Sequence, residues 1–259
     1  MWSKFRILKR SEPRQKPVPQ REASFPPVRL DGCDLLAVIG DIHGMDRAFE
    51  AMLDRLTALS PAARIICVGD LIDRGEQSAE ALRRAFELRD QIEVILGNHE
   101  EMLLRFLDDP EAQGPRWLRY GGLQCLASFG VGGVSATSDA SVMPVARDAL
   151  RLAMGPDLES WLRARPRLVQ CGNVAVVHAG ADPWAPISGQ SNQSLTWGHP
   201  DFGTRARTDG MWVVHGHTVV EKPLAVRGVV SVDTGAYAGG GLTAALLSAS
   251  GVEFVTVSL

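Results

Sequence analysis

Residues 35–44 read LLAVIGDIHG, five apolar residues and a glycine followed by Asp41 and His43. A short apolar run that ends at a turn signal is typical of a buried strand. Glycines let the backbone turn tightly after the strand, and aspartate and histidine are ligands for divalent cations. This stretch therefore predicts a buried strand with a candidate cation-binding turn at its carboxyl end.

The same arrangement recurs twice. Residues 64–70 read RIICVGD and residues 92–99 read IEVILGNH, so Asp70 and Asn98 also follow apolar runs. Apolar residues at helical spacing come after each turn, and the turns are separated by roughly the 30 residues of one β-α-β unit. Because open α/β sheets bind ligands at the carboxyl ends of their strands, we expect these turns to meet at one sheet edge.

The second half of the chain predicts a mainly β layer packed on the first, after a mostly helical stretch from 114 to about 165. Its strand-like runs are 168–170, 174–177, 212–214, 229–232, 242–247 and 252–255.

Composition and charge narrow the class of protein. The formal net charge of -3 over 259 residues gives no general signal for binding nucleic acid, and we expect no such partner. Residues 1–30 differ: they are rich in proline and hold eight Lys or Arg against two Glu. They predict a flexible basic arm, able to contact an acidic partner or surface, ahead of a single domain at 31–259. With no apolar run of membrane-spanning length and no C-x-x-C pair, we expect a cytoplasmic protein with reduced thiols.

Two later histidine blocks complete the candidate metal ligands: residues 178–180 read HAG and residues 215–218 read HGHT. We interpret one metal set as Asp41, His43 and Asp70, and the other as Asp70, Asn98, His178 and His217. A carboxylate shared in this way can hold two cations about 3.5–4 Å apart, as two-metal hydrolases require. Mixed oxygen and nitrogen ligands favour manganese, iron or zinc over calcium, and manganese is the cation we expect first.

Taken together, the blocks GDIHG, GDLIDRG, GNHE, HAG and HGHT resemble the phosphoprotein phosphatase family of metallophosphoesterases. The resemblance is to its small bacterial and phage members, the serine/threonine protein phosphatases, and spans about residues 36–248. It implies an α/β fold, a four-layer α/β/β/α sandwich with a dinuclear site between the two sheets, built as one catalytic domain.

The resemblance also implies roles for single residues. The six ligands above match the family's metal ligands. His99 matches its general acid, Asp73 the carboxylate that orients this histidine, and Arg74 the arginine that binds phosphate, with Asn98 beside it. We expect the neighbouring Glu100 and His215 to support the site by hydrogen bonds instead of binding metal.

One position departs from the family pattern. Members carry a second phosphate-binding arginine two residues after a tryptophan, whereas here Trp197 is followed by Gly198 and His199. A histidine donates one hydrogen bond where an arginine forms a bidentate pair. We therefore expect weaker phosphate binding through His199, a more acid-dependent KM, or substitution by a nearby arginine such as Arg205 or Arg207.

The predicted function is a metal-dependent phosphomonoesterase, best matched to a protein serine/threonine phosphatase in which a metal-bridging hydroxide attacks phosphorus directly. The alternative within the superfamily is a hydrolase of dinucleoside polyphosphates such as diadenosine tetraphosphate. Asp73, Arg74 and Glu100 favour the phosphoprotein interpretation, since the symmetrical tetraphosphatases typically lack them. A further alternative, a non-catalytic phosphopeptide-binding module, is disfavoured by the intact ligand set.

Overall fold

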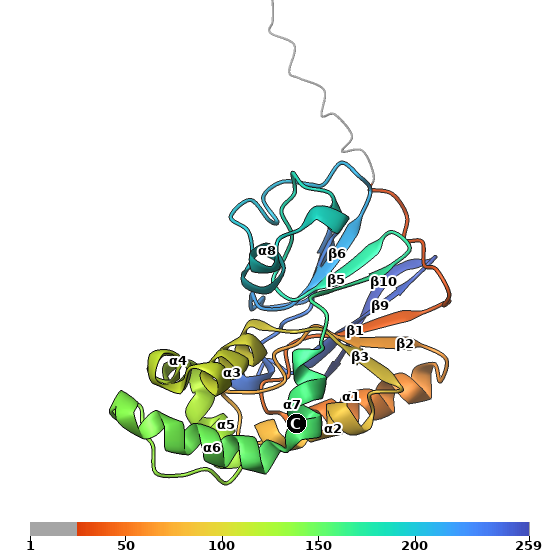
Figure 1. Cartoon of the computed structure of the whole chain (residues 1–259). Coiled ribbons are helices and arrows are strands. Elements are labelled where there is room, and N and C mark those ends of the chain that lie inside the picture. Colours follow the sequence, from red (N-terminus) through yellow and green to blue (C-terminus); the bar gives the residue numbers. More distant parts are fainter. Residues whose placement is uncertain (1–24, 259) are drawn as a thin grey trace, which may run out of the picture.

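The computed structural model describes residues 25–258, which form two five-stranded sheets (Figure 1). The first has the strand order β10-β9-β1-β2-β3, and the second the order β4-β5-β6-β8-β7. The strands of the first sheet are β1 (Leu36–Ile39), β2 (Arg64–Cys67), β3 (Ile92–Val94), β9 (Leu242–Ser248) and β10 (Gly251–Val257). Those of the second are β4 (Leu168–Cys171), β5 (Val174–Val177), β6 (Trp212–His215), β7 (Leu224–Val226) and β8 (Val229–Ser231).

The parallel half of the first sheet consists of the predicted β-α-β units. β1, β2 and β3 are parallel neighbours, so their carboxyl ends meet at one edge. The helices between and after them bury their apolar stripes against this sheet, as Phe49, Met52 and Leu56 do on the first helix. These helices are α1 (Asp46–Leu59), α2 (Ser78–Glu87) and α3 (Asn98–Asp108).

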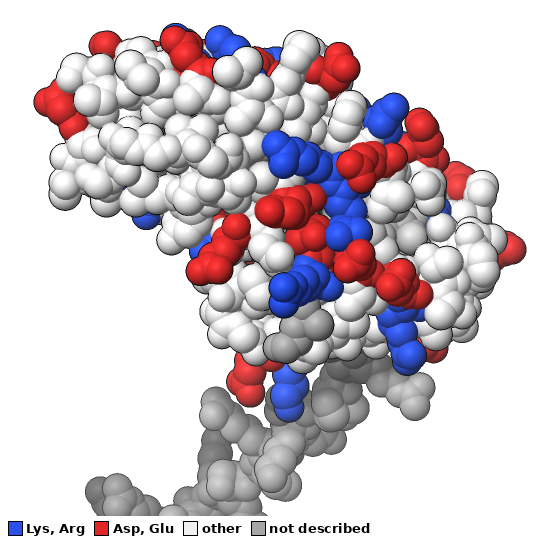
Figure 2. All heavy atoms as spheres, turned by 90° about the horizontal axis from the view of Figure 1, so that it is seen from below, with Lys and Arg blue, Asp and Glu red and all other residues white. Residues whose placement is uncertain are grey.

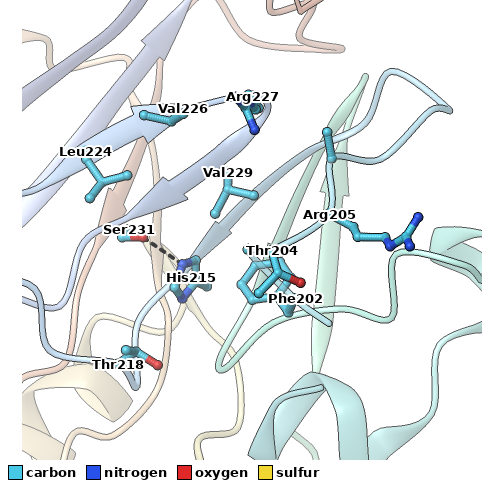
Figure 3. A pocket seen from close by; sticks show the side chains of 12 residues that line it. Phe202, Thr204, Arg205, His215, Thr218, Leu224, Val226, Arg227, Val229 and Ser231 are labelled. Atoms are coloured by element: carbon cyan, nitrogen blue, oxygen red, sulfur yellow. Dashed lines mark hydrogen bonds between the residues drawn. The ribbon is translucent and has the colours of Figure 1, made fainter. Parts of the chain in front are cut away.

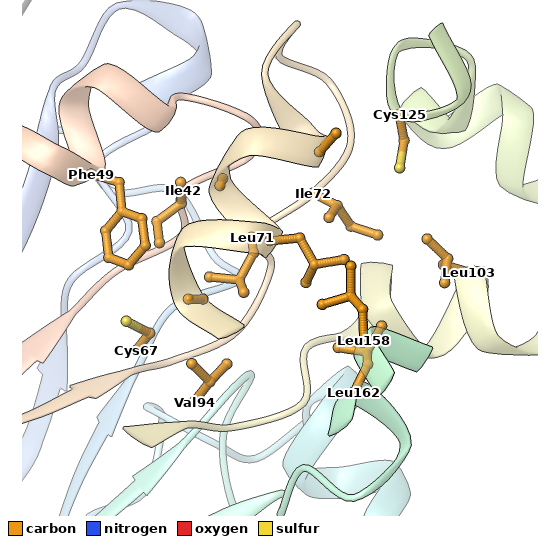
Figure 4. Packing of buried hydrophobic residues seen from close by; sticks show 14 of the residues in the cluster. Ile42, Phe49, Cys67, Leu71, Ile72, Val94, Leu103, Cys125, Leu158 and Leu162 are labelled. Carbon is orange, nitrogen blue, oxygen red and sulfur yellow. The ribbon is translucent and has the colours of Figure 1, made fainter. Parts of the chain in front are cut away.

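Alternating side chains of the central strands enter two different cores. Leu36 and Val38 of β1 pack with Val176 of the second sheet, in the layer between the sheets. Ile39 points to the opposite face, where it packs with Phe49 in the core under the helices. Figure 4 shows part of this helix-side core. A strand whose two faces are both buried needs apolar residues throughout, which explains the unbroken apolar run at 35–39.

A fourth layer lies on the outer face of the second sheet. There α8 (Asn192–Trp197) packs Leu195 against Ala175, Val177 and Val213. The layers are therefore helices, sheet, sheet, and α8 with its loops. This confirms the predicted α/β/β/α sandwich.

The middle of the chain is helical, as predicted, and packs on α2 and α3. Its α-helices are α4 (Pro110–Trp117), α5 (Leu123–Ser128), α6 (Met143–Met154) and α7 (Pro156–Arg163). Shorter helical segments are η1 (Leu118–Gly122), η2 (Ala140–Val142), η3 (Ile187–Gly189) and η4 (Ala236–Ala238). Seen from below, basic and acidic side chains lie side by side on the described surface (Figure 2). Ion pairs also join elements, such as Arg84 with Asp46 and Arg163 with Asp108, each at 2.7 Å. The face in Figure 2 therefore lacks the single-sign patch of a polyanion-binding surface.

Three features differ from the sequence expectations. β9 and β10 pair antiparallel with the first sheet instead of joining the second layer, because β9 hydrogen-bonds to β1. β7 was not predicted; its three residues are exposed at a sheet edge. Residues 25–30, assigned to the flexible arm, are packed: Val28 is buried, and the Arg29 backbone N–H donates to Asn173 Oδ1 at 2.7 Å. The rest of the predicted arm lies outside the described residues.

Among residues 25–258, no helix is both long enough and apolar enough to cross a membrane.

Candidate metal centre

Polar side chains from both sheets converge where the strands end. Asp41 follows β1, Asp70 follows β2, and Asn98 begins α3 after β3. His178 directly follows β5 and His217 comes shortly after β6 in the second sheet. The turns of the first sheet are tied together, since the His43 N–H donates to Asp70 O at 2.8 Å. The structure thus brings together the residues that the sequence proposed as metal ligands.

The backbone at this site adopts left-handed conformations that side chains rarely take. Five of its residues have positive φ: His43 at 45°, Asp70 at 49°, Asp73 at 71°, Arg74 at 67° and His217 at 63°. Such residues cost of order 1–3 kcal/mol each and persist only where surrounding contacts hold them. Strained residues of this kind cluster at active sites and ligand-binding sites.

Glu100 makes some of the contacts that hold these turns in place. Its carboxylate is buried and accepts three backbone hydrogen bonds: from Asp70 N at 2.8 Å, Leu71 N at 2.7 Å and Gly97 N at 3.0 Å. The contact to Gly97 also caps the start of α3. Glu100 thus fastens the Asp70 turn to the helix that carries Asn98 and His99.

Asp70 lies at the centre of the cluster. Its Oδ2 is 3.6 Å from His43 Nε2, 3.4 Å from His178 Nε2 and 3.9 Å from His99 Nε2. Two groups of side chains could each hold a metal ion, and both contain Asp70: one adds His43 and His99, the other His178 and His217. A single carboxylate shared by two groups is the arrangement expected of a bridging ligand.

The imidazoles present lone pairs to the cluster. His43 Nδ1 donates to Ile72 O at 2.9 Å, which leaves Nε2 as an acceptor, and this buried Nε2 has no partner within the described structure. His178 Nδ1 likewise donates to Val68 O at 2.8 Å, so its Nε2 faces Asn98 Oδ1, another acceptor, at 2.8 Å. With neutral His178, these two converging acceptors are satisfied by a cation bound to both. The residues present therefore fit bound divalent metal.

The pKa values of these imidazoles agree with that role. Burial lowers the pKa of His43 to about 3 and that of His217 to about 4, and it also lowers the pKa of His178. Neutral imidazole is the form that binds metal. Each of the three histidines is therefore ready to act as a ligand near pH 7.

The buried carboxylates of the cluster also indicate bound cations. Asp41 accepts hydrogen bonds from the His217 backbone N–H with both oxygens, at 3.1 and 3.0 Å. Burial, reinforced by Asp233 and Asp70, raises the pKa of Asp41 well above its usual range. Asp233 is itself buried, and its Oδ2 has no partner among the described residues. Three buried carboxylates this close are costly without compensating positive charge, which two cations would provide.

His99 is held differently from the other histidines. Its Nδ1 lies 2.6 Å from Asp73 Oδ2, and the same oxygen accepts a hydrogen bond from Trp117 Nε1 at 2.9 Å. Burial alone would lower the pKa of His99, but Asp70 and Asp73 outweigh it and raise the pKa above the usual value. A histidine that stays protonated to higher pH, oriented by a carboxylate, is suited to general acid catalysis.

Arg74 lies beside His99 and, with Tyr237, lines two surface hollows. Its Nη2 is 3.2 Å from His99 Nε2, and its guanidinium lies 4.6 Å from the ring centroid of Tyr237. The Tyr237 ring also contacts the His43 ring edge to face at 5.1 Å. Sequence reasoning did not single out Tyr237. Two signals were available: it lies in a glycine-rich turn, and it is one of only two tyrosines in the chain. The guanidinium is placed to bind phosphoryl oxygens beside the candidate acid.

Comparison with known proteins decides the family. The family model described as calcineurin-like phosphoesterase matches residues 35–221, which contain the candidate metal ligands and His99. The chain belongs to this calcineurin-like phosphoesterase family. It is therefore a metal-dependent phosphoesterase.

Relatives of this calcineurin-like phosphoesterase include two bis(5'-nucleosyl)-tetraphosphatases. The asymmetrical enzyme PrpE of Geobacillus thermodenitrificans is 30% identical over 80% of this chain and 88% of its own. The symmetrical enzyme of Chromobacterium violaceum is 33% identical over 58% of this chain and 44% of its own. Among solved structures, a putative diadenosine tetraphosphatase superposes with a TM-score of 0.61 at 20% identity, covering 88% of this chain and 96% of that one. That structural likeness concerns the fold alone.

The remaining predicted residues of this calcineurin-like phosphoesterase lie around the cluster. His199 is partly buried and lines a hollow with His217, so it borders the metal centre. Arg207, one proposed substitute, is committed elsewhere: it donates to the carbonyls of Asp182 and Ala185 and pairs with Asp209. The other proposed substitute, Arg205, lies 4.6 Å over the Trp184 ring.

His215 is placed behind the cluster. Its Nδ1 donates to Gly216 O at 2.9 Å, and its Nε2 accepts from Ser231 Oγ at 2.8 Å. Both ring nitrogens are therefore engaged by the protein. A Cβ at the next residue, Gly216, would lie 1.8 Å from Asp41 Oδ1, so only glycine fits between His215 and His217.

Proposed function

We propose that this phosphoesterase hydrolyses dinucleoside polyphosphates, with diadenosine tetraphosphate as the model substrate. The observation that carries the proposal is the cluster around Asp70, with Arg74 and His99 on its rim. The substrate class is supported by relatives from Geobacillus and Chromobacterium that are bis(5'-nucleosyl)-tetraphosphatases. This chain aligns with 88% of the Geobacillus enzyme, and we assign the substrate class of that enzyme.

The chain's own residues divide the work. Asp41, His43 and Asp70 would hold one cation, and Asp70, Asn98, His178 and His217 the other. When bound, two divalent cations lower the pKa of water and neutralise phosphoryl oxygens. Arg74 binds the phosphoryl group through a planar guanidinium beside His99. His199 lines a hollow on the His217 side of the centre, and Asn98 Oδ1 lies 2.8 Å from His217 Nδ1.

His99 supplies the proton at the leaving group. In the structure its Nε2 can accept from Arg74 Nη2 at 3.2 Å. A phosphoryl group that draws this guanidinium to itself removes the contact and frees Nε2 to carry a proton. Asp73 keeps Nδ1 protonated and the ring oriented.

Asp73, Arg74 and Glu100 do not select the substrate class. The sequence interpretation used these three residues to favour a phosphoprotein substrate, but each has a role that does not depend on the substrate class. Asp73 orients His99, Arg74 faces the phosphoryl group, and Glu100 fastens the Asp70 turn. These tasks are common to hydrolysis of phosphate esters and phosphoanhydrides. Our choice of substrate class therefore follows the relatives. Preferred hydrolysis of phosphoserine or phosphothreonine is the competing outcome of the test.

The test compares initial rates of the full chain, stripped of metal and reloaded with Mn²⁺, on diadenosine tetraphosphate and on a phosphothreonine peptide. We expect kcat/KM to be higher for the dinucleotide, with AMP and ATP as products if cleavage is asymmetrical and ADP alone if it is symmetrical. A higher kcat/KM for the peptide would overturn the proposal.

The His99→Asn variant serves as an internal check of leaving-group chemistry. A phosphate leaves as a stable anion, whereas a threonine alkoxide needs a proton as the bond breaks. We expect the variant to lose more activity on the peptide than on the dinucleotide. Full activity on both would remove His99 from the mechanism.

A further inference from the structure

A cavity of about 370 Å³ lies beside the metal centre, between the edge of the second sheet and the loop of residues 202–206 (Figure 3). We propose that this cavity binds the nucleoside of the nucleotide substrate. The inference rests on the proposed function and adds the place where the base and its sugar are recognised. Its volume is in the range of small-molecule sites.

The cavity adjoins the metal centre through two shared side chains. A second hollow, lined by the candidate ligand His217 and by His199, shares Phe202 and Thr218 with it. Thr218 directly follows His217 in the chain. The inference places the phosphate of the ligand at the cations and its nucleoside on the other side of these two shared residues, in the cavity.

The walls of the cavity are mainly apolar. Leu224 and Val226 of β7 are 38% and 53% exposed, and Val229 and the Phe202 ring face the same space (Figure 3). Large apolar side chains that stay exposed around a hollow usually mark a binding site. An aromatic ring beside aliphatic side chains suits the flat face of a base, which stacks on such surfaces.

The polar side chains that line the cavity are three with hydroxyl groups, one histidine, His215, and two arginines, Arg205 and Arg227. Thr204, Thr218 and Ser231 line it, and hydroxyls can recognise a base edge or a ribose. The Arg205 side chain points away from the cavity in Figure 3 and stacks on Trp184. Arg227, in the turn between β7 and β8, is the other cationic side chain of the lining. Because the remaining walls are apolar or carry hydroxyls, we infer that a flat and partly apolar group occupies them.

The test measures binding without turnover. The Mn²⁺-loaded full chain is titrated calorimetrically with adenosine 5'-(α,β-methylene)diphosphate, whose P–C–P bridge resists hydrolysis, and with methylenediphosphonate, which lacks the nucleoside. We expect the nucleotide analogue to bind about tenfold more tightly, the lower part of the range for stacking of one base. Equal affinities would overturn the inference.

Two variants locate the contribution. Val226→Glu puts a charge on the apolar wall, and Thr204→Trp fills the space from the exposed loop. We expect each to remove most of the tenfold advantage and leave methylenediphosphonate binding unchanged. Val145→Glu, at an exposed valine of α6, is the matched control and should keep the advantage.

The inference and the proposed function fail in different ways. If both cavity variants keep the tenfold advantage, the nucleoside binds elsewhere and the inference is wrong, whatever the enzyme hydrolyses. If diadenosine tetraphosphate is cleaved more slowly than the phosphopeptide, the proposed function is wrong even where the analogue binds.

Discussion

At the residue scale, His99 and Asp73 form the contact on which proton transfer depends. Asp73 is fully buried, and its Oδ2 is shared between His99 Nδ1 and Trp117 Nε1. Because Asp73 and Asp70 raise the pKa of His99, the imidazolium that can donate a proton persists to higher pH. Activity should therefore fall as the pH rises through this pKa, which sets the alkaline limb of the kcat profile.

The Asp73→Asn variant should shift that limb to lower pH. The substitution removes one of the two carboxylates that raise the pKa of His99, so the proton is lost earlier as pH rises. For the phosphothreonine peptide, whose alkoxide leaving group needs a proton, we also expect kcat near pH 8 to fall by about 10²–10⁴-fold, the usual contribution of a general acid. The measurement is kcat from pH 5 to 9, with the exposed Asp157→Asn as control. An alkaline limb that stays in place would contradict the assignment.

Glu100 shows how one buried carboxylate can hold a strained turn. Glu100→Gln keeps the shape of the side chain but turns one of its acceptor oxygens into a donor facing a backbone N–H. We expect a loss of about 1–3 kcal/mol in the free energy of unfolding, from one unmade buried hydrogen bond. Urea denaturation checks this, and Glu80→Gln on the exposed face of α2 is the control. Equal unfolding free energies for both variants would show that the Glu100 contacts are dispensable.

At the element scale, the segment after α4 positions the phosphate-binding arginine. Trp117 ends α4 and donates to Asp73, and the Arg74 N–H donates to Gly121 O at 3.4 Å. Gly121 has a φ of 106°, and a Cβ there would lie 2.6 Å from Arg74 N. The kink at Gly121 is therefore required for the backbone of Arg74 to approach.

Gly121→Ala should displace Arg74 and weaken turnover. The added methyl group meets backbone atoms that cannot move independently of the Asp73–Arg74 turn. Misplacement of a catalytic group by about 1 Å can cost 10²-fold, and we expect kcat/KM to fall by about that factor. Gly132→Ala is the control, because a Cβ there meets nothing within 4 Å. Wild-type kcat/KM in Gly121→Ala would mean that Arg74 does not depend on this segment.

Elements whose positions follow from local sequence patterns were predictable from the sequence. The three strand, turn and helix repeats place Asp41, Asp70 and Asn98 by chain connectivity alone, and β1 to β3 follow them. The partners of β9 and the position of β7 depend on long-range strand pairing. The spacing of apolar residues along the chain gives no information about such pairing. Asp233 and Tyr237 reach the site because η4 and its flanking turns fold back on it, so their roles emerge only from tertiary contacts.

At the scale of the whole molecule, the two sheets are joined through the cluster. The first sheet supplies Asp41, Asp70 and Asn98, and the second supplies His178 and His217. His178 Nδ1 also bonds to Val68 O across the sheets, which fixes the ring that faces Asp70. Cations bound between the layers should add to the stability of their packing, since ligands that bind only the folded state stabilise it.

The most direct test of this account counts the cations. Metal-stripped protein is titrated with Mn²⁺, and the stoichiometry is read by calorimetry for wild type, Asp41→Asn and Asp70→Asn. We predict two Mn²⁺ per wild-type chain and one in Asp41→Asn, which leaves the other ligand set intact. Asp70→Asn should lose tight binding at both positions, because its carboxylate is shared. A single Mn²⁺ in wild type, or two retained in Asp70→Asn, would contradict a dinuclear centre bridged by Asp70.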